Sequence, residues 1–321
     1  MKHYIKMKKR AAFTMIELVF VIMILGIVSS IGAEIIAKLY ENYIVQRATQ
    51  RSSLSTEIAA NLIANRLSYA IHKTIIGRKD DSANGYPFRG IDSLDGTDYT
   101  ILEWVGHDAD NFHGVCSSHH LPGLSGLCDL DKSTKDGLYS SASDLYFART
   151  NIEKLGGKIG KSAIFFPGEY DINTIGYKLA SGVDGQGISA TATGVSVVSL
   201  SFVPNDGNIR TIPLRPRAAG VGRTLKEQYK LAWSAYAIVP APVDSTGIAG
   251  TFNLQLRKNF RPWLDEHFHT DQNIDISTII KNVSVFQFTG SDGTIRFKIC
   301  QQARINDEDV VTTCKEKAVI Q

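Results

Sequence analysis

The chain has 321 residues, of which 43% are hydrophobic and 21% are charged, and this balance excludes a wholly disordered chain and a collagen-like fibre. The formal net charge is +3, but residues 1–12 hold five basic and no acidic side chains, which leaves 30 basic and 32 acidic side chains in the remainder. A slightly acidic body argues against nucleic acid as the main partner, because phosphate binding requires a basic surface.

An apolar run follows the basic start. Residues 13–33 are 21 residues with a single charge, Glu17. As a helix this run is roughly 31 Å long, about the thickness of the hydrocarbon core of a bilayer. Basic residues in front of a spanning helix stay in the cytoplasm. We therefore expect a single pass through the inner membrane, with the bulk of the chain in the periplasm.

Three interpretations of this run differ in how they treat Glu17. A secretory signal peptide has a shorter apolar run without a charge, and the small-residue cleavage signal near residues 30–32 is weak. A simple signal anchor leaves the carboxylate of Glu17 without a partner, at a cost of about 2.5–3.5 kcal/mol. Cleavage between Ala12 and Phe13 instead creates a positive α-amine one helical turn from Glu17. In a stack of such helices, Glu17 can also reach the amine of a neighbouring subunit and set the register.

Residues 8–18, Lys-Lys-Arg-Ala-Ala-Phe-Thr-Met-Ile-Glu-Leu, resemble the prepilin cleavage and methylation motif. That motif belongs to type IV pilins and to the pseudopilins of type II secretion, and the resemblance covers about residues 8–40. It implies that a prepilin peptidase cuts the Ala12–Phe13 bond, that Phe13 becomes the N-methylated terminus, and that Glu17 is the assembly residue. The sequence departs from the motif at Ala12, where the family usually has glycine.

The resemblance has further implications. Gly26 falls where many pilin helices carry a glycine that loosens the helix. The implied partners are other pilin or pseudopilin subunits, an inner-membrane assembly platform and the lipid bilayer.

Helical periodicity continues beyond the membrane. Proline does not occur before residue 87, and apolar residues recur at spacings of three to five at Leu54, Ile58, Leu62, Leu67, Ile71 and Ile75. The pattern predicts one helix over residues 13–76, capped by Gly77, with an apolar stripe that a sheet covers. The serines of residues 52–55 are a weak point at which this helix can fray or bend.

Residues 77–321 are predicted to form a β-rich extracytoplasmic head. The fold class is therefore α+β: a long N-terminal helix, first membrane-spanning and then amphipathic, packed on a mostly antiparallel sheet with long loops. The resemblance implies the same arrangement. Hairpin turns are expected at Asp206-Gly207 and Asp292-Gly293. The predicted strands cover residues 99–105, 145–149, 163–166, 195–203, 231–239, 251–257, 283–288 and 294–300.

Two of the four cysteines lie near the C-terminus. Four cysteines allow three pairings, and an exported compartment permits disulfides. Cys300 and Cys314 are equidistant from Asp307, which lies in a polar turn, so a hairpin there places the two cysteines opposite each other. The resemblance points to the same C-terminal disulfide.

The other two cysteines, Cys116 and Cys128, then close a loop that holds His119 and His120. A zinc site built from these four residues is the alternative to a second disulfide. The residue types suit zinc, but their spacing is not a recognised one, and oxidised cysteines cannot be ligands. We expect the disulfide and no metal.

No catalytic motif is complete. Residues 156–162 approach a P-loop, but Leu155 stands where its first glycine is required. Residues 266–269 lack the His-Glu-x-x-His pattern of zinc proteases, and we expect a surface loop beside Trp263. The aspartates of residues 92–98 and 129–131 do not match an EF-hand, which favours solvated turns and leaves calcium open. We expect no cofactor and no enzymatic activity.

The sequence thus predicts a structural subunit of a type IV pilus or a type II secretion pseudopilus. The mature chain of 309 residues is bulkier than the usual repeating pilin, which favours a minor subunit in initiation or at the tip. Secretion, motility, adhesion and DNA uptake all remain open. The alternative is a membrane-anchored adhesin or receptor outside any filament, whose loops at residues 78–98, 106–137 and 171–194 contact a ligand. A membrane-anchored periplasmic enzyme is a third class that no motif supports.

Overall fold

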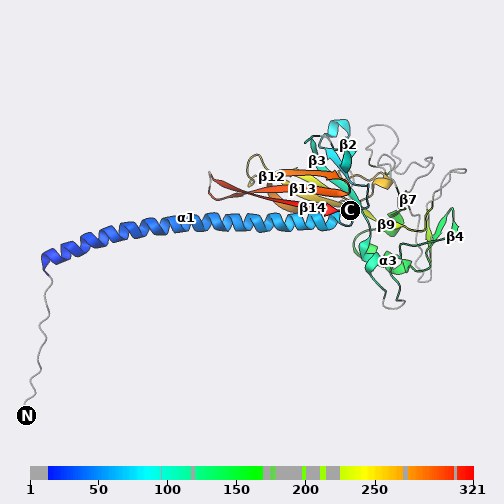
Figure 1. Ribbon diagram of the computed structural model, residues 1–321, viewed down its shortest axis with the longest axis horizontal. Coiled ribbons are helices and arrows are strands. Elements are labelled where there is room, and N and C mark those ends of the chain that lie inside the picture. The colour runs from blue at the N-terminus through cyan, green and yellow to red at the C-terminus, as the bar shows by residue number, and fades with distance from the viewer. Residues whose placement is uncertain are drawn as a thin grey trace, which may run out of the picture.

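A long helix projects from a β-rich head in the computed structural model (Figure 1). The sequence prediction of an α+β fold, with a long N-terminal apolar helix on a mostly antiparallel sheet, is confirmed. The structure describes residues 14–94, 96–116, 120–168, 175, 177, 197–199, 210–214, 225–269, 274–306 and 309–321. The predicted turn at Asp206-Gly207 lies outside these residues.

The helix α1 runs from Met15 to Leu67. It is continuous through the serines of residues 52–55, where the sequence allowed a bend. It also ends before the predicted residue 76, because the backbone beyond it joins the sheet: the N–H of Ile71 donates to the carbonyl of Val105 over 2.8 Å. Gly77, the predicted helix cap, instead lies in the strand β1.

The main sheet has eight strands in the order β14-β13-β12-β11-β10-β3-β1-β2, and all neighbours are antiparallel. The predicted turn between β12 and β13 is confirmed: Asp292 and Gly293 have φ of 49° and 74°, which is the geometry of a type I′ hairpin. The strands are β1 (Ile76–Lys79), β2 (Phe88–Gly90), β3 (Tyr99–Gly106), β10 (Ser234–Pro242), β11 (Phe252–Phe260), β12 (Asp275–Ser291), β13 (Thr294–Arg304) and β14 (Val310–Ile320).

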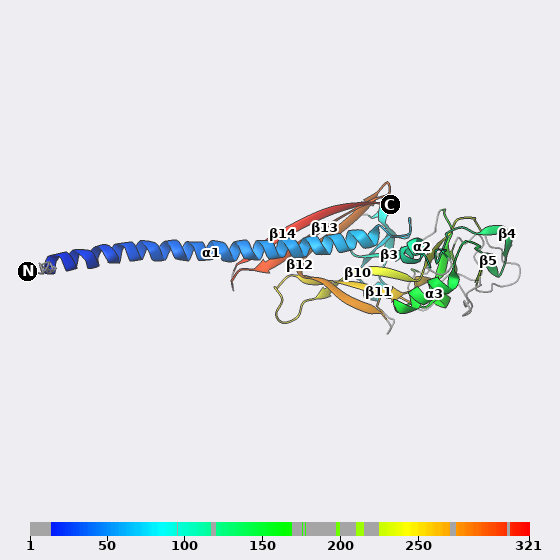
Figure 2. The ribbon, with the colours of Figure 1, turned by 90° about the horizontal axis from the view of Figure 1, so that it is seen from below.

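The C-terminal half of α1 packs on one face of this sheet, as Figure 2 shows. Its buried face consists of small and apolar residues, whereas Leu54 and Ile58 of the predicted stripe are 62% and 57% exposed. Leu67 of the same stripe is buried, so the prediction is wrong for the first part of the stripe and right for its last residue in the helix. The buried residues of α1 are Ser52, Thr56, Ala59, Ala60, Ile63 and Leu67.

The opposite face of the sheet carries a second apolar core and a buried ion pair. Arg78 of β1 and Glu103 of β3 are 1% and 0% exposed, and the guanidinium donates from Nε to Glu103 Oε2. Its Nη2 also donates to the carbonyl of Tyr177 over 2.7 Å. These contacts compensate for the removal of both charges from water, since an unpaired buried charge is strongly destabilising.

Beyond the main sheet, the head holds smaller elements, and several of them, including α3, surround a third apolar core. Residues 145–149, predicted as a strand, belong to the helix α3, because Asp144 caps its N-terminus by accepting from the N–H of Phe147 over 3.0 Å. These elements are α2 (Ala109–His113), α3 (Leu145–Lys154), β4 (Asp129–Thr134), β5 (Gly137–Tyr139), β6 (Ala163–Phe165), β7 (Val197–Ser199), β8 (Thr211–Pro213), β9 (Lys230–Ala232) and the short 3-10 helices η1 (Ser82–Asn84), η2 (Ile91–Ser93), η3 (Ile159–Lys161) and η4 (Pro262–Leu264).

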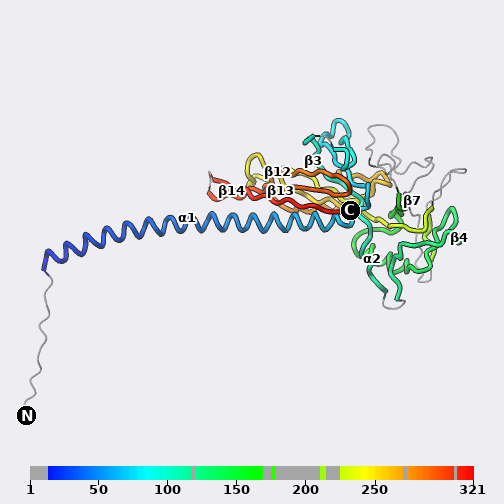
Figure 3. The backbone as a smooth tube through the Cα atoms, in the orientation of Figure 1, coloured from blue at the N-terminus to red at the C-terminus, as the bar shows by residue number. Residues whose placement is uncertain are grey.

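The chain ends beside the helix on which the head is built. In Figure 3 the C-terminus lies next to the end of α1, and Gln321 Nε2 donates to the carbonyl of Leu67 over 2.5 Å. The same carbonyl also accepts from the N–H of Ala70 over 2.9 Å, so the chain end adds a second bond at the end of the helix.

Candidate assembly interface

The N-terminal half of α1 is an apolar rod without contacts to the head. Every large apolar side chain from Met15 to Tyr43 is at least half exposed, and the buried residues of α1 begin only at Ser52. Among the described residues, α1 is the helix that is long enough and apolar enough to cross a membrane. Burying such a side chain contributes about 1.5–3 kcal/mol, so water is a poor environment for the rod and lipid or other apolar helices are good ones.

Glu17 is the one charge in this rod before Glu34. It lies in the first turn of α1, is exposed, and has no hydrogen-bond or ion-pair partner among the described residues. The positive end of the helix favours a carboxylate at this position but does not neutralise it. Ala12 and Phe13, the predicted cleavage site, lie outside the described residues, so the new α-amine remains a prediction.

Gly26 lies in the middle of the rod, and no contact within the described chain requires a glycine there. A Cβ built at this position meets no atom within 4 Å, and α1 continues straight through it. Glycine in an exposed helix costs about 1 kcal/mol relative to alanine. The predicted role of Gly26, in loosening the helix, stays a prediction.

The C-terminal half of α1 is joined to the head by polar contacts as well as by apolar packing. Glu57 forms ion pairs with Lys317 and Lys315 at 2.8 and 3.1 Å. The hydrogen bonds from Lys317 and Lys315 lower the pKa of Glu57 from 4.5 to about 2. Gln301 Oε1 of β13 accepts from Ser52 Oγ over 3.2 Å. From Ser52 onward α1 is therefore joined to the head by both apolar and polar contacts.

The predicted C-terminal disulfide is confirmed. Cys300 of β13 and Cys314 of β14 lie directly opposite each other and are bonded. The disulfide fixes the last hairpin of the sheet, on which α1 rests.

The second predicted pairing, Cys116 with Cys128, is not formed, and both are free thiols. Cys128 is held elsewhere: its N–H donates to the carbonyl of Glu227 over 2.8 Å and its Sγ to that of Lys226 over 3.2 Å. Burial raises the pKa of the Cys128 thiol. His119, part of the zinc alternative, lies outside the described residues, and within the described part of the chain no three His, Cys, Asp or Glu side chains could hold a metal ion.

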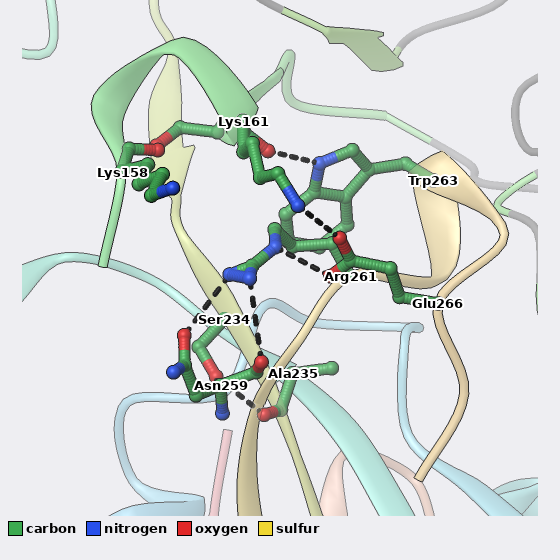
Figure 4. A network of polar contacts seen from close by, with 9 residues as sticks. Lys158, Lys161, Ser234, Ala235, Asn259, Arg261, Trp263 and Glu266 are labelled. Atoms are coloured by element: carbon green, nitrogen blue, oxygen red, sulfur yellow. Dashed lines mark hydrogen bonds and ion pairs between the residues drawn. The ribbon is translucent and has the colours of Figure 1, made fainter. Parts of the chain in front are cut away.

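The two incomplete motifs meet in one structural network (Figure 4). Lys161 Nζ donates to Glu266 Oε1 and Arg261 Nε to Glu266 Oε2, both over 2.6 Å. Trp263 Nε1 donates to the carbonyl of Lys161 over 2.8 Å. Glu266 thus ties the segment after η4 to Lys161 of η3. Residues 266–269 form the expected loop beside Trp263, but the expectation of a surface position is wrong for His267 and Phe268, which are buried.

The far part of the head contains a largely apolar cavity of about 410 Å³. It lies beside residues 106–137, one of the loops expected to contact a ligand in the receptor alternative. Burial raises the pKa of Asp108 and lowers that of His107 at its wall. Its lining includes His107, Phe112, Leu124, Leu127, Tyr229 and Leu231.

Residues 7–33 match the family described as the prokaryotic N-terminal methylation motif. Comparison with curated proteins and with solved structures gives no match. The motif together with the long apolar helix fits a type IV prepilin-like protein, and it points to a structural subunit rather than an enzyme.

Proposed function

We propose that the chain is a minor pilin or pseudopilin, a subunit that acts in the initiation or at the tip of a type IV pilus or a type II secretion pseudopilus. The observation that carries the proposal is the exposed apolar rod of α1, whose first part belongs to a methylation motif. The head, which packs on α1 from Ser52 onward, faces outward from the filament.

The mechanism follows from the rod. Prepilin peptidase cuts between Ala12 and Phe13, and the mature rod holds the subunit in the inner membrane with its head in the periplasm. Transfer into a filament, through the assembly platform, exchanges lipid for the rods of neighbours, so the apolar surface stays covered throughout. Glu17 then pairs with the amine of a neighbouring Phe13 and sets the register, because an unpaired carboxylate in this environment is costly.

A charge-removing substitution tests the role of Glu17. Glu17→Gln keeps the shape and the apolar rod, so membrane insertion is expected to stay unchanged while recovery in filaments sheared from cells falls. The matched control is Glu34→Gln, which removes an exposed carboxylate of the same helix that pairs with Lys38. Removing a partner of a charged hydrogen bond costs about 1.5–3 kcal/mol, a factor of roughly 10 to 150 in recovery. Equal recovery of both variants contradicts the proposal.

The second candidate is a membrane-anchored ligand-binding protein outside any filament. The cavity beside residues 106–137 favours it. The same pair of variants separates the two, since a mere anchor tolerates Glu17→Gln and a filament subunit does not.

A further inference from the structure

The strand β14 leaves one edge of the main sheet open over its whole length. β14 has 11 residues without proline, and it pairs with β13 in a register that no bulge interrupts. Within the described chain no strand pairs with its other side. The opposite edge strand, β2, has only 3 residues. Long, regular edges are uncommon because they attract further strands, so proteins usually shorten or interrupt them.

Two hydrogen bonds at the ends of β14 determine which backbone groups face outward. The N–H of Gln321 donates to the carbonyl of Gly293 over 2.8 Å, and the N–H of Ile305 donates to the carbonyl of Asp309 over 2.9 Å. Hydrogen-bonded and non-hydrogen-bonded pairs alternate along antiparallel strands. The odd-numbered residues of β14 therefore bond to β13, and the even-numbered residues direct their N–H and C=O away from it.

The disulfide gives an independent check of this alternation. The Cα atoms of Cys300 and Cys314 are 4.0 Å apart, as in the closer, non-hydrogen-bonded class of pairs. The outward groups have no hydrogen-bond partner in the described chain. The residues that present them are Val310, Thr312, Cys314, Glu316, Ala318 and Ile320.

The direction of β14 argues against antiparallel pairing of this edge with the β14 of a second copy. Lys315 lies against Glu57, and Gln321 lies against Leu67, so β14 runs in the same direction as α1. Antiparallel pairing of two β14 strands would point the two helices in opposite directions. Subunits anchored in one membrane cannot adopt that arrangement.

We propose that the open edge of β14 accepts an extended segment of a different subunit, which adds a ninth strand to the sheet. This proposal rests on the proposed function, which supplies partner subunits in the same filament. Main-chain hydrogen bonds to the even-numbered residues hold the segment, and side chains on its two faces give specificity.

The chemistry on either side of the edge describes the segment. On the face toward α1, Lys315 and Lys317 share the single carboxylate of Glu57, so an acidic residue fits opposite them. On the other face, Thr312, Ala318 and Ile320 are exposed and suit β-branched or apolar neighbours. The occupant is therefore a strand of about ten residues with one central acidic side chain facing α1.

Residue-resolved amide hydrogen exchange of the full chain tests the proposal. The chain is compared alone in detergent and in the complex extracted from the membranes or filaments of producing cells. We expect the amides of Thr312, Glu316 and Ala318 to exchange at least tenfold more slowly in the complex, while those of Lys315 and Lys317 change little. Equal rates for the even-numbered amides in both states overturn the proposal. Absence of the chain from sheared filaments contradicts the proposed function instead. In that case, exchange in the membrane-extracted complex still shows whether the edge of β14 is occupied.

A proline variant supplies the second test. Glu316→Pro removes one outward N–H and no bond to β13, and Glu316→Ala, its control, removes only the side chain. We expect similar melting temperatures and at least a tenfold lower recovery of partner subunits with the proline variant. Equal recovery contradicts the proposal, and if the proline variant does not fold, the exchange experiment on the unmodified chain decides.

Discussion

The orientation of α1 on the head can be tested by truncating one residue on each side of the helix. Ile63 is fully buried against the sheet, in the same core as Trp104, whereas Ile58 is 57% exposed on the opposite side. Ile63→Ala removes buried methyl groups and leaves a cavity, which costs about 2–5 kcal/mol. Ile58→Ala changes an exposed site, where effects stay within about 0.5 kcal/mol.

The assay is thermal unfolding of the full chain in detergent, followed by tryptophan fluorescence. For a head of this size each kcal/mol shifts the melting temperature by about 2–4 °C, so Ile63→Ala is expected to lower it by about 4–20 °C. Ile58→Ala is expected to shift it by about 2 °C or less. The reasoning is refuted if the two variants are destabilised equally, or if Ile58→Ala is the less stable one, as the apolar stripe in the sequence alone predicts.

Three further predictions concern charges and the disulfide. The lowered pKa of Glu57 means that its ion pairs stabilise the fold above pH 4.5, the ordinary value, and that this contribution is lost as the pH falls toward 2. Glu57→Gln is therefore expected to flatten the acid limb of stability against pH between these values, and an unchanged limb argues against the pairing. Replacing both Cys300 and Cys314, 14 positions apart, by alanine is expected to lower the free energy of unfolding by about 3 kcal/mol, measured by urea unfolding. A loss under 0.5 kcal/mol would mean that the hairpin closes equally well without the bond. Arg78→Met leaves Glu103 charged and buried, at an expected cost of about 3–5 kcal/mol in the same assay. As a control, adding Glu103→Leu to Arg78→Met is expected to restore stability, because it removes the unpaired charge. If the double variant is as unstable as Arg78→Met, the cause is not electrostatic.

The sequence was sufficient for features that depend on local pattern. The apolar run, the absence of early proline and the alternation of residues 283–288 and 294–300 predicted α1 and two strands of the main sheet. The Asp292-Gly293 turn was predictable because a type I′ turn requires positive φ at both central residues, and the structure has both. The Cys300–Cys314 pair followed from its symmetry about a polar turn.

Features that depend on tertiary packing were not predictable in this way. The face of α1 was misjudged because Ala59 and Ala60 pack on the sheet, while the larger Leu54 and Ile58 remain exposed. The size and apolarity of single side chains could not show which face of the helix contacts the sheet. The predicted end of α1 was too far along the chain for a similar reason. The N–H of Ile71 donates to the carbonyl of Val105 in the sheet, and the helix ends before this residue.

The remaining errors have local signals that could have been used. Asp144 in front of an apolar 3–4 spacing is a helix start, and it distinguishes α3 from a strand. Residues 266–269 were expected as a surface loop because they match no motif, but Glu266 pairs with Lys161 and Arg261. The pair of Lys161 and Glu266 joins segments 105 positions apart in the chain, and no single-sequence pattern shows it.

The central claim, that the chain is processed and assembled as a filament subunit, is tested most directly at its N-terminus. The measurement is the intact mass and N-terminal sequence of the membrane-extracted protein, from cells with and without a prepilin peptidase. The account predicts a mature chain that begins at N-methylated Phe13, and only when the peptidase is present. A chain that begins at Met1 in both cases, or one cut near Ala33, would contradict it.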